Sequence, residues 1–169
     1  MRWESIYRLA CKLQAAQVRY LVVGGVAVYA WGYERFTKDL DLVISLAPES
    51  IDRTFQVLTE GGYKPALALL RAEDLKEPGI RRRLIEEKNL TAVQFINEKE
   101  PDTSVDLLIT EPFDFETEYA KAYVSELPGG AEVRIVWIDT LLDMKSRAGR
   151  EQDLADVAVL RKLHGRPKT

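Results

Sequence analysis

The stretch of sequence that most constrains the fold is VVGGVAVYAWGYERFTKDLDLVI, residues 22–44. A short β-rich run ends at Gly24 and Gly25, and the small apolar residues that follow have the length and composition of a buried helix. Residues 39–45 alternate in polarity and then become apolar, which indicates a strand that is buried at one end. The segment therefore predicts a strand, a glycine turn, a helix and a second strand.

Helical and strand patterns alternate along the rest of the chain, which predicts an α+β fold with an α/β-type mixed sheet flanked by helices. The patterns predict helices over residues 3–13, 48–62, 112–123 and 139–164, and strands over 19–23, 91–97, 104–110 and 131–138. Turn-forming residues 98–103 predict a hairpin. Residues 64–90 are interrupted at Pro78 and form either two short helices or a flexible insertion. Asp139 is a candidate helix cap, and Gly149 separates two C-terminal helices.

Size and composition narrow the class of protein. With 169 residues and 19.2 kDa, we expect one domain over residues 1–169. The net charge of −3 argues against a protein that coats nucleic acid through a broad basic face. Cys11 is the only cysteine, which fits a reducing compartment. The most apolar run, residues 20–32, is shorter than the roughly 18 to 20 residues that cross a bilayer, and no signal-peptide core is present. We expect a soluble, cytoplasmic protein with no membrane partner.

Two aspartates open the second strand of the key segment. Asp39 and Asp41 stand two positions apart, so their side chains project to one side while Leu40 and Leu42 point into the core. Neighbouring carboxylates repel one another and raise each other's pKa, and a divalent cation relieves this repulsion. Hard oxygen ligands favour Mg²⁺ over zinc. The alternative is a pair of solvated aspartates on an edge strand.

A third carboxylate, Asp106, interrupts the apolar strand predicted over residues 104–110. A charge in such a strand is costly unless it has a partner. If this strand pairs with the one that carries Asp39 and Asp41, the three carboxylates meet at one point of the sheet. Such a cluster can hold two Mg²⁺ ions roughly 4 Å apart, as in-line phosphoryl displacement requires. Alternatively, Asp106 lies at a strand end and accepts a hydrogen bond from a backbone amide.

The glycine pair suggests a phosphate site. A helix N-terminus carries unpaired N–H groups and partial positive charge, and residues without Cβ let phosphate approach the backbone. Gly24 and Gly25 are therefore a candidate phosphate cradle. The alternative is a tight turn without a ligand, since neither a P-loop nor the dinucleotide-binding glycine motif is present.

Three basic residues are candidate contacts for a triphosphate. Arg35 and Lys38 precede the aspartate strand, and Lys145 lies on a predicted C-terminal helix. The alternatives are solubilising loop residues for the first two and a solvated surface lysine for Lys145. Arg150 and Asp153 have the spacing of an i,i+3 ion pair.

The order of these motifs resembles a known superfamily. A glycine pair, thirteen residues, an Asp-Leu-Asp strand and a later lone aspartate resemble the nucleotidyltransferase fold of DNA polymerase β, kanamycin nucleotidyltransferase and minimal bacterial members. GGVAVYAWGYERFTKDLDLVI is especially similar to AbiEii-like nucleotidyltransferases, and LLDMKSRAGREQDLADVAVLRKL resembles their C-terminal helices. The resemblance covers most of the chain apart from residues 64–100. It departs at Gly25, where many members have Ser, and at Gln152, where a basic residue is frequent.

The resemblance implies a Mg²⁺-dependent enzyme that moves an NMP from an NTP to a hydroxyl acceptor and releases pyrophosphate. It implies phosphate binding by the backbone of Gly24 and Gly25. Asp39 and Asp41 would bind two metal ions. Asp106 would complete the metal on the attacking side and help to deprotonate the acceptor. The acceptor would be a protein side chain, an RNA 3′ end or a small hydroxylated molecule.

Partners and competing functions follow from the same resemblance. A cognate toxin or antitoxin protein is the implied partner, and a homodimer mate is a second way for a short chain to complete its site. One competing function is a non-catalytic protein that keeps the nucleotidyltransferase fold to bind a partner, although all three carboxylates are present. A metal-dependent nuclease is another, because nucleases also use clustered carboxylates.

Overall fold

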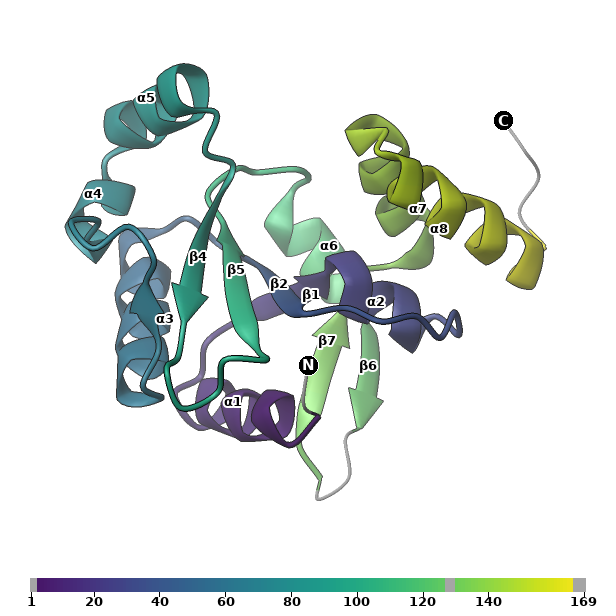
Figure 1. The fold of residues 1–169 in the computed structure, drawn as a ribbon, viewed down its shortest axis with the longest axis horizontal. Coiled ribbons are helices and arrows are strands. Elements are labelled where there is room, and N and C mark those ends of the chain that lie inside the picture. Colours follow the sequence, from purple (N-terminus) through teal and green to yellow (C-terminus); the bar gives the residue numbers. More distant parts are fainter. Residues whose placement is uncertain (1–2, 127–129, 166–169) are drawn as a thin grey trace.

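The structure is a computed structural model that describes residues 3–126 and 130–165. These residues form a mixed sheet of seven strands in the order β3-β4-β5-β2-β1-β7-β6 (Figure 1). The strands are β1 Tyr20–Val23, β2 Asp39–Ile44, β3 Lys64–Pro65, β4 Ala92–Ile96, β5 Ser104–Leu108, β6 Tyr123–Glu126 and β7 Glu132–Ile135. The helices are α1 Trp3–Ala15, α2 Gly24–Ala30, α3 Pro48–Glu60, α4 Ala72–Lys76, α5 Pro78–Lys88, α6 Phe115–Lys121, α7 Ile138–Ala148 and α8 Glu151–Leu163.

The pairing of the strands confirms the predicted mixed sheet flanked by helices. β2 pairs antiparallel with β1 and parallel with β5, and β4 pairs antiparallel with β5 as the predicted hairpin. β2 lies at the centre of the strand order, so the alternative that Asp39 and Asp41 lie on an edge strand is wrong. In Figure 1, α7 and α8 lie side by side next to α2, at the right of the view. Helices α3, α4 and α5 lie at the left of the view, near β4.

The local structure corrects several predictions. Residues 64–90 contain α4 and α5 with Pro78 in the first turn of α5, so this stretch is two short helices. The two edge strands β3 and β6 were not predicted. Asp139 lies within the first turn of α7 and Trp137 is the cap residue, so the predicted cap is wrong. Gly149 ends α7 with a φ of +65° and separates it from α8, as predicted.

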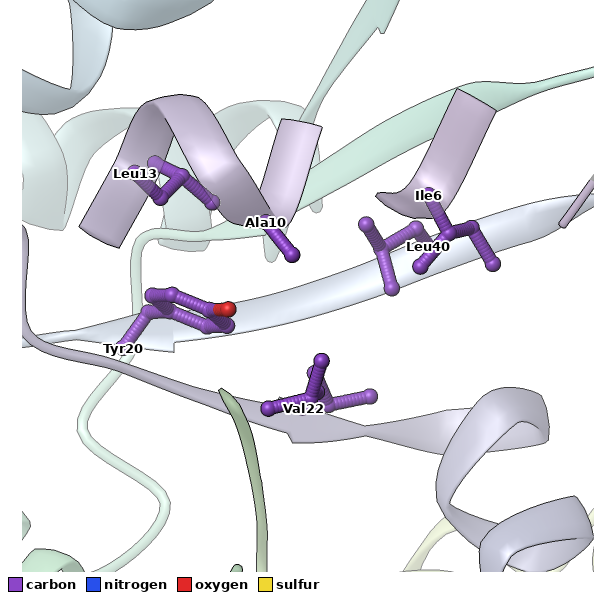
Figure 2. A pocket seen from close by; sticks show the side chains of 7 residues that line it. Ile6, Ala10, Leu13, Tyr20, Val22 and Leu40 are labelled. Atoms are coloured by element: carbon purple, nitrogen blue, oxygen red, sulfur yellow. The ribbon is translucent and has the colours of Figure 1, made fainter. Parts of the chain in front are cut away.

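Helix α1 covers one face of the sheet with an apolar stripe. Figure 2 shows Ile6, Ala10 and Leu13 of α1 above side chains from β1 and β2. They surround a cavity of about 10 Å³ lined by Ile6, Ala10, Leu13, Tyr20, Val22, Leu40 and Val133. The cavity is a packing defect of the core, because an apolar void of this size holds no more than one water molecule. Leu40 thus anchors the face of β2 that is opposite to Asp39 and Asp41.

No helix within residues 3–126 or 130–165 is long and apolar enough to cross a membrane.

Candidate active site

The parallel pairing of β2 with β5 brings the three candidate carboxylates together. In this register Asp41 stands directly opposite Asp106, and Asp39 stands opposite Ser104. Paired residues on neighbouring strands project to the same face, so all three carboxylates lie on one side of the sheet. Leu40 is fully buried on the other side. The condition set by the sequence, that the two strands pair, is therefore confirmed.

Gly24 makes room for Asp41. It begins α2 with a φ of +61°, a backbone conformation that suits glycine. Its neighbour Val23 pairs with Asp41 across the β1–β2 ladder. A Cβ atom added at Gly24 would collide with the Asp41 carboxylate. The glycine pair and the aspartate pair are thus in direct contact, although 15 residues of sequence separate Gly25 from Asp41.

Gly25 accommodates the loop that leads into β2. A Cβ atom at this position would lie 2.5 Å from Thr37 Oγ1 and 3.2 Å from Arg35 Nη2. The Ser that many nucleotidyltransferases carry here would collide with Thr37 in this structure. Gly25 is thus matched to the close approach of this loop. Its backbone amide also lies close enough to the Asp41 carboxylate to lower the pKa of that group, against the larger effects of burial and Asp106.

The carboxylates lie in an environment that disfavours their charges. Burial, followed by repulsion from Asp106, raises the pKa of Asp41 to about 7. Burial and the charge of Asp39 likewise raise the pKa of Asp106. The Oδ1 atom of Asp106 is buried and has no hydrogen-bond partner among residues 3–126 and 130–165. Within the described ranges, no Lys or Arg nitrogen lies within 4.0 Å of the three carboxylates. The site thus contains negative charge that the chain itself does not neutralise.

The donor set fits hard divalent cations. Carboxylate oxygens are the ligands that Mg²⁺ prefers, and the unpartnered Oδ1 of Asp106 offers a free acceptor. In the conformation described, no group of three or more His, Cys, Asp or Glu side chains among residues 3–126 and 130–165 is gathered closely enough to hold a metal ion. A metal at Asp39, Asp41 and Asp106 therefore stays a prediction, which requires rotation of these side chains.

Ser104 is a polar neighbour of the site that the sequence did not single out. Its hydroxyl donates a hydrogen bond to Oδ1 of Asp39 across the β2–β5 ladder. This contact holds one carboxylate oxygen of Asp39 toward β5. Its position two residues before Asp106 was the available signal, since residues two apart share a face of a strand.

The predicted basic residues lie in different surroundings. Lys145 is 6% exposed and its Nζ lies 2.8 Å from both Asp153 and Asp156, so the surface-lysine alternative is wrong. Its charge still lowers the pKa of Asp41. Arg35 pairs with Asp156, and Lys38 is exposed one residue before β2.

The predicted ion pair between Arg150 and Asp153 is confirmed, at 2.7 Å. Phosphate contacts by the basic residues stay predictions.

Comparison with solved structures finds a nucleotidyltransferase of the same length and architecture. The lincomycin-bound lincosamide antibiotic adenylyltransferase LnuA superposes with a TM-score of 0.60 at 14% identity, over 96% of this chain and 98% of that one. An antigenic nucleotidyltransferase-like protein from Paracoccidioides brasiliensis gives a TM-score of 0.52 at 20% identity, over 94% and 73% of the two chains. This chain has the nucleotidyltransferase fold.

A further solved structure, JHP933 from Helicobacter pylori, gives a TM-score of 0.51 at 17% identity over 94% of this chain and 64% of that one. No protein-family model matches the chain, and no curated protein sequence matches it. The likeness therefore establishes the nucleotidyltransferase fold and leaves the AbiEii-like resemblance a prediction.

Proposed function

We propose that the protein is a nucleotidyltransferase that moves an NMP from an NTP to a hydroxyl acceptor. One observation carries the proposal. Asp41 and Asp106 face each other on neighbouring strands next to the glycine turn, and the described residues place no cation against them. A purely structural cluster would be expected to supply its own counter-charge, because uncompensated buried carboxylates cost stability.

In the proposed reaction, one P–O bond forms and one breaks. The acceptor oxygen attacks the α-phosphorus, a new P–O bond forms, and the bond from the α-phosphorus to the bridging oxygen breaks, so that pyrophosphate leaves. The acceptor proton moves to a carboxylate. We propose Asp106 for this task, because the resemblance assigns it to the attacking side of the site.

Asp39, Asp41 and Asp106 would hold two Mg²⁺ ions. When bound, such ions polarise the phosphate and neutralise the charge that develops during transfer. The contribution of the chain is to fix the carboxylates: the backbone amide of Gly25 favours the charged form of Asp41, and Ser104 donates a hydrogen bond to Asp39. In phosphoryl-type transfer, this positioning supplies much of the rate enhancement.

The phosphates would bind at the glycine turn. Gly24 and Gly25 offer backbone without side chains, and Arg35 Nη2 reaches the edge of this turn. Lys38 and Lys145 would add positive charge. Since Lys145 is held by two aspartates, it would act at a distance, as its influence on the pKa of Asp41 illustrates.

Among the acceptor classes, a small hydroxylated molecule is the first to test. LnuA, which matches this chain over 98% of its own length, is described as an adenylyltransferase of a lincosamide antibiotic. This match over nearly the whole length of a small-molecule adenylyltransferase supports a small-molecule acceptor. Proteins and RNA 3′ ends remain alternative acceptors. A cognate toxin or antitoxin and a homodimer mate remain proposed partners.

The test is transfer of label from each α-³²P-NTP with Mg²⁺, offered separately to an aminoglycoside and lincosamide panel, to total RNA and to a protein extract. We expect label on one class of acceptor and stoichiometric release of pyrophosphate. Cleavage of nucleic acid without NTP would instead support a nuclease. The absence of both labelled product and NTP binding would support a non-catalytic protein.

A further inference from the structure

The loop between α2 and β2 is held by a buried ion pair. Arg35 in this loop donates from Nη2 to Oδ2 of Asp156 on α8, at 2.9 Å. Its Nε lies 2.9 Å from Oδ1 of the same carboxylate, as an ion pair without hydrogen-bond alignment. Its Nη1 donates to the carbonyl of Phe36 at 3.0 Å. One guanidinium therefore connects α8 to the backbone of the loop.

The same guanidinium lies against the glycine turn. Arg35 Nη2 and Thr37 Oγ1 are the groups that a Cβ atom at Gly25 would meet. The hydroxyl of Thr37 also lies 3.4 Å from the carbonyl of Asp39, to which it donates weakly. The position of Arg35 thus sets how closely this loop covers the proposed phosphate site.

Asp156 is well placed to fix Arg35. Its side chain is fully buried, and its carboxylate also receives Lys145 of α7 at 2.8 Å and Gln152 Nε2 at 3.0 Å. A carboxylate held by several donors has little freedom to rotate. Asp156 is therefore a fixed point in the α7–α8 hairpin, whereas Arg35 belongs to a segment without regular structure.

A second contact joins the start of the same loop to α8. His164, which directly follows α8, packs edge-on against the ring of Trp31, with 5.5 Å between centroids. Its Nε2 lies 2.7 Å from the carbonyl of Trp31. The loop of residues 31–38 is thus attached to the α8 region at its start, through the contacts of Trp31 with His164, and in its middle, through the ion pair of Arg35 with Asp156.

We propose that Asp156 is a positioning residue that acts through Arg35 and holds the loop of residues 31–38 over the glycine turn. Without Asp156 this loop opens, whereas Asp39, Asp41 and Asp106 stay on their paired strands. The consequence for nucleotide rests on the proposed function: loss of Asp156 raises the KM for NTP by about tenfold and changes kcat by less than about threefold.

Asp153 provides the matched control. It lies one turn from Asp156 on α8, is 4% exposed and also pairs with Lys145, but its other cationic partner is Arg150. Asp156→Asn and Asp153→Asn remove the same charge with the same change in shape. Only Asp156→Asn removes the partner of Arg35.

The test is limited proteolysis of the nucleotide-free protein with trypsin, with mass spectrometry of the cut after Arg35. The cut after Arg71, an exposed residue at the start of α4, serves as the internal reference. We expect Asp156→Asn to accelerate the cut after residue 35 about tenfold relative to this reference, and Asp153→Asn to change it less than about twofold. Equal acceleration in both variants, or none in Asp156→Asn, would overturn the proposal.

A second variant removes the contact from the loop side. Arg35→Lys keeps the tryptic site but cannot span Asp156 and the Phe36 carbonyl, so the same acceleration is expected even if Asp156→Asn fails to fold. Unchanged cleavage in Arg35→Lys would also overturn the proposal. Proteolysis needs no nucleotide, so a wild-type protein that transfers no NMP would refute the proposed function while the cleavage pattern still decides the role of Asp156.

Discussion

The molecule contains two clusters of aspartates, and they differ in whether cationic side chains pair with them. Asp153 and Asp156 on α8 each contact two cationic side chains at 2.7 to 2.9 Å. Burial alone would raise the pKa of Asp153, but hydrogen bonds from Lys145 and Arg150 outweigh it and lower the pKa. Both carboxylates of this cluster are thus paired with cationic side chains.

In the described part of the chain, no cationic side chain pairs with the cluster on β2 and β5. Burial and repulsion between the carboxylates raise the pKa of Asp41, through Asp106, and that of Asp106, through Asp39. One oxygen of Asp106 has no hydrogen-bond partner among the described residues. The chain clearly has the means to neutralise buried carboxylates, since it does so on α8. This difference supports our proposal that the α8 cluster serves stability and that the β2–β5 cluster binds an external cation.

The largest expected effect is on catalysis at the unneutralised cluster. Asp41→Asn should lower NMP transfer by about 10³-fold or more, because it removes a charge on which the reaction depends, while the fold is kept. Pyrophosphate release measures the loss of transfer, and thermal unfolding of the same preparation shows whether the fold is kept. Asp143→Asn, at an exposed pair with Arg147 on α7, is the control. Activity within tenfold of the wild type would contradict a catalytic role for the β2–β5 cluster.

The next effect is on stability at the neutralised cluster. Asp156→Ala should lower the free energy of unfolding by about 3–5 kcal/mol, because it leaves Lys145 and Arg35 without their buried partner. Urea denaturation measures the change. Asp143→Ala should cost less than about 1 kcal/mol, because its ion pair is solvent-exposed. Similar losses in both variants would mean that burial of the ion pair is unimportant.

The pH dependence of stability should reveal the raised pKa of Asp41. This group ionises near 3.8 when unperturbed and at about 7 in the folded protein. Between these values the folded state binds more protons, so its contribution to stability falls as pH rises, by at most about 1.4 kcal/mol per pH unit. The penalty is complete above pH 7 and disappears below pH 4.

Comparison with Asp41→Asn isolates this contribution. In urea denaturation between pH 4.5 and 7.5, the wild type should lose stability relative to the variant as pH rises. Parallel stability curves for the two proteins would show that Asp41 is not destabilised by its surroundings.

The smallest expected effect concerns the orientation of Asp39. Ser104→Ala removes the hydroxyl that donates to this carboxylate. Because one hydrogen bond contributes about 1 kcal/mol to stability, the free energy of unfolding should fall by about that amount, and transfer should fall by about three- to tenfold as Asp39 loses its orientation. Steady-state kinetics with saturating NTP measure the change in kcat. An unchanged kcat would show that Ser104 does not orient Asp39 for the reaction.

The sequence was most informative where periodicity and turn chemistry act locally. Alternation placed Asp39 and Asp41 on the polar face of a strand, and the glycine pair located the strand-to-helix turn. The edge strands were missed because β3 has only two residues, one of them Pro65, and pattern analysis needs longer runs.

Long-range contacts could not be predicted in the same way. The sequence offered Lys145 as a phosphate ligand or a surface residue, whereas its aspartate partners become neighbours only when α8 packs against α7. Likewise, the requirement for Gly25 comes from Thr37, which approaches it only after the loop folds back. These contacts depend on tertiary packing, which local propensity does not specify.

The most direct test of the central claim is a titration with Mn²⁺, a spectroscopic substitute for Mg²⁺, followed by electron paramagnetic resonance. We expect the wild type and Asp153→Asn to bind Mn²⁺, and Asp41→Asn and Asp106→Asn to lose this binding. Equal binding by the wild type and Asp41→Asn, or no binding by the wild type at millimolar Mn²⁺, would contradict the claim that the β2–β5 carboxylates are reserved for a cation.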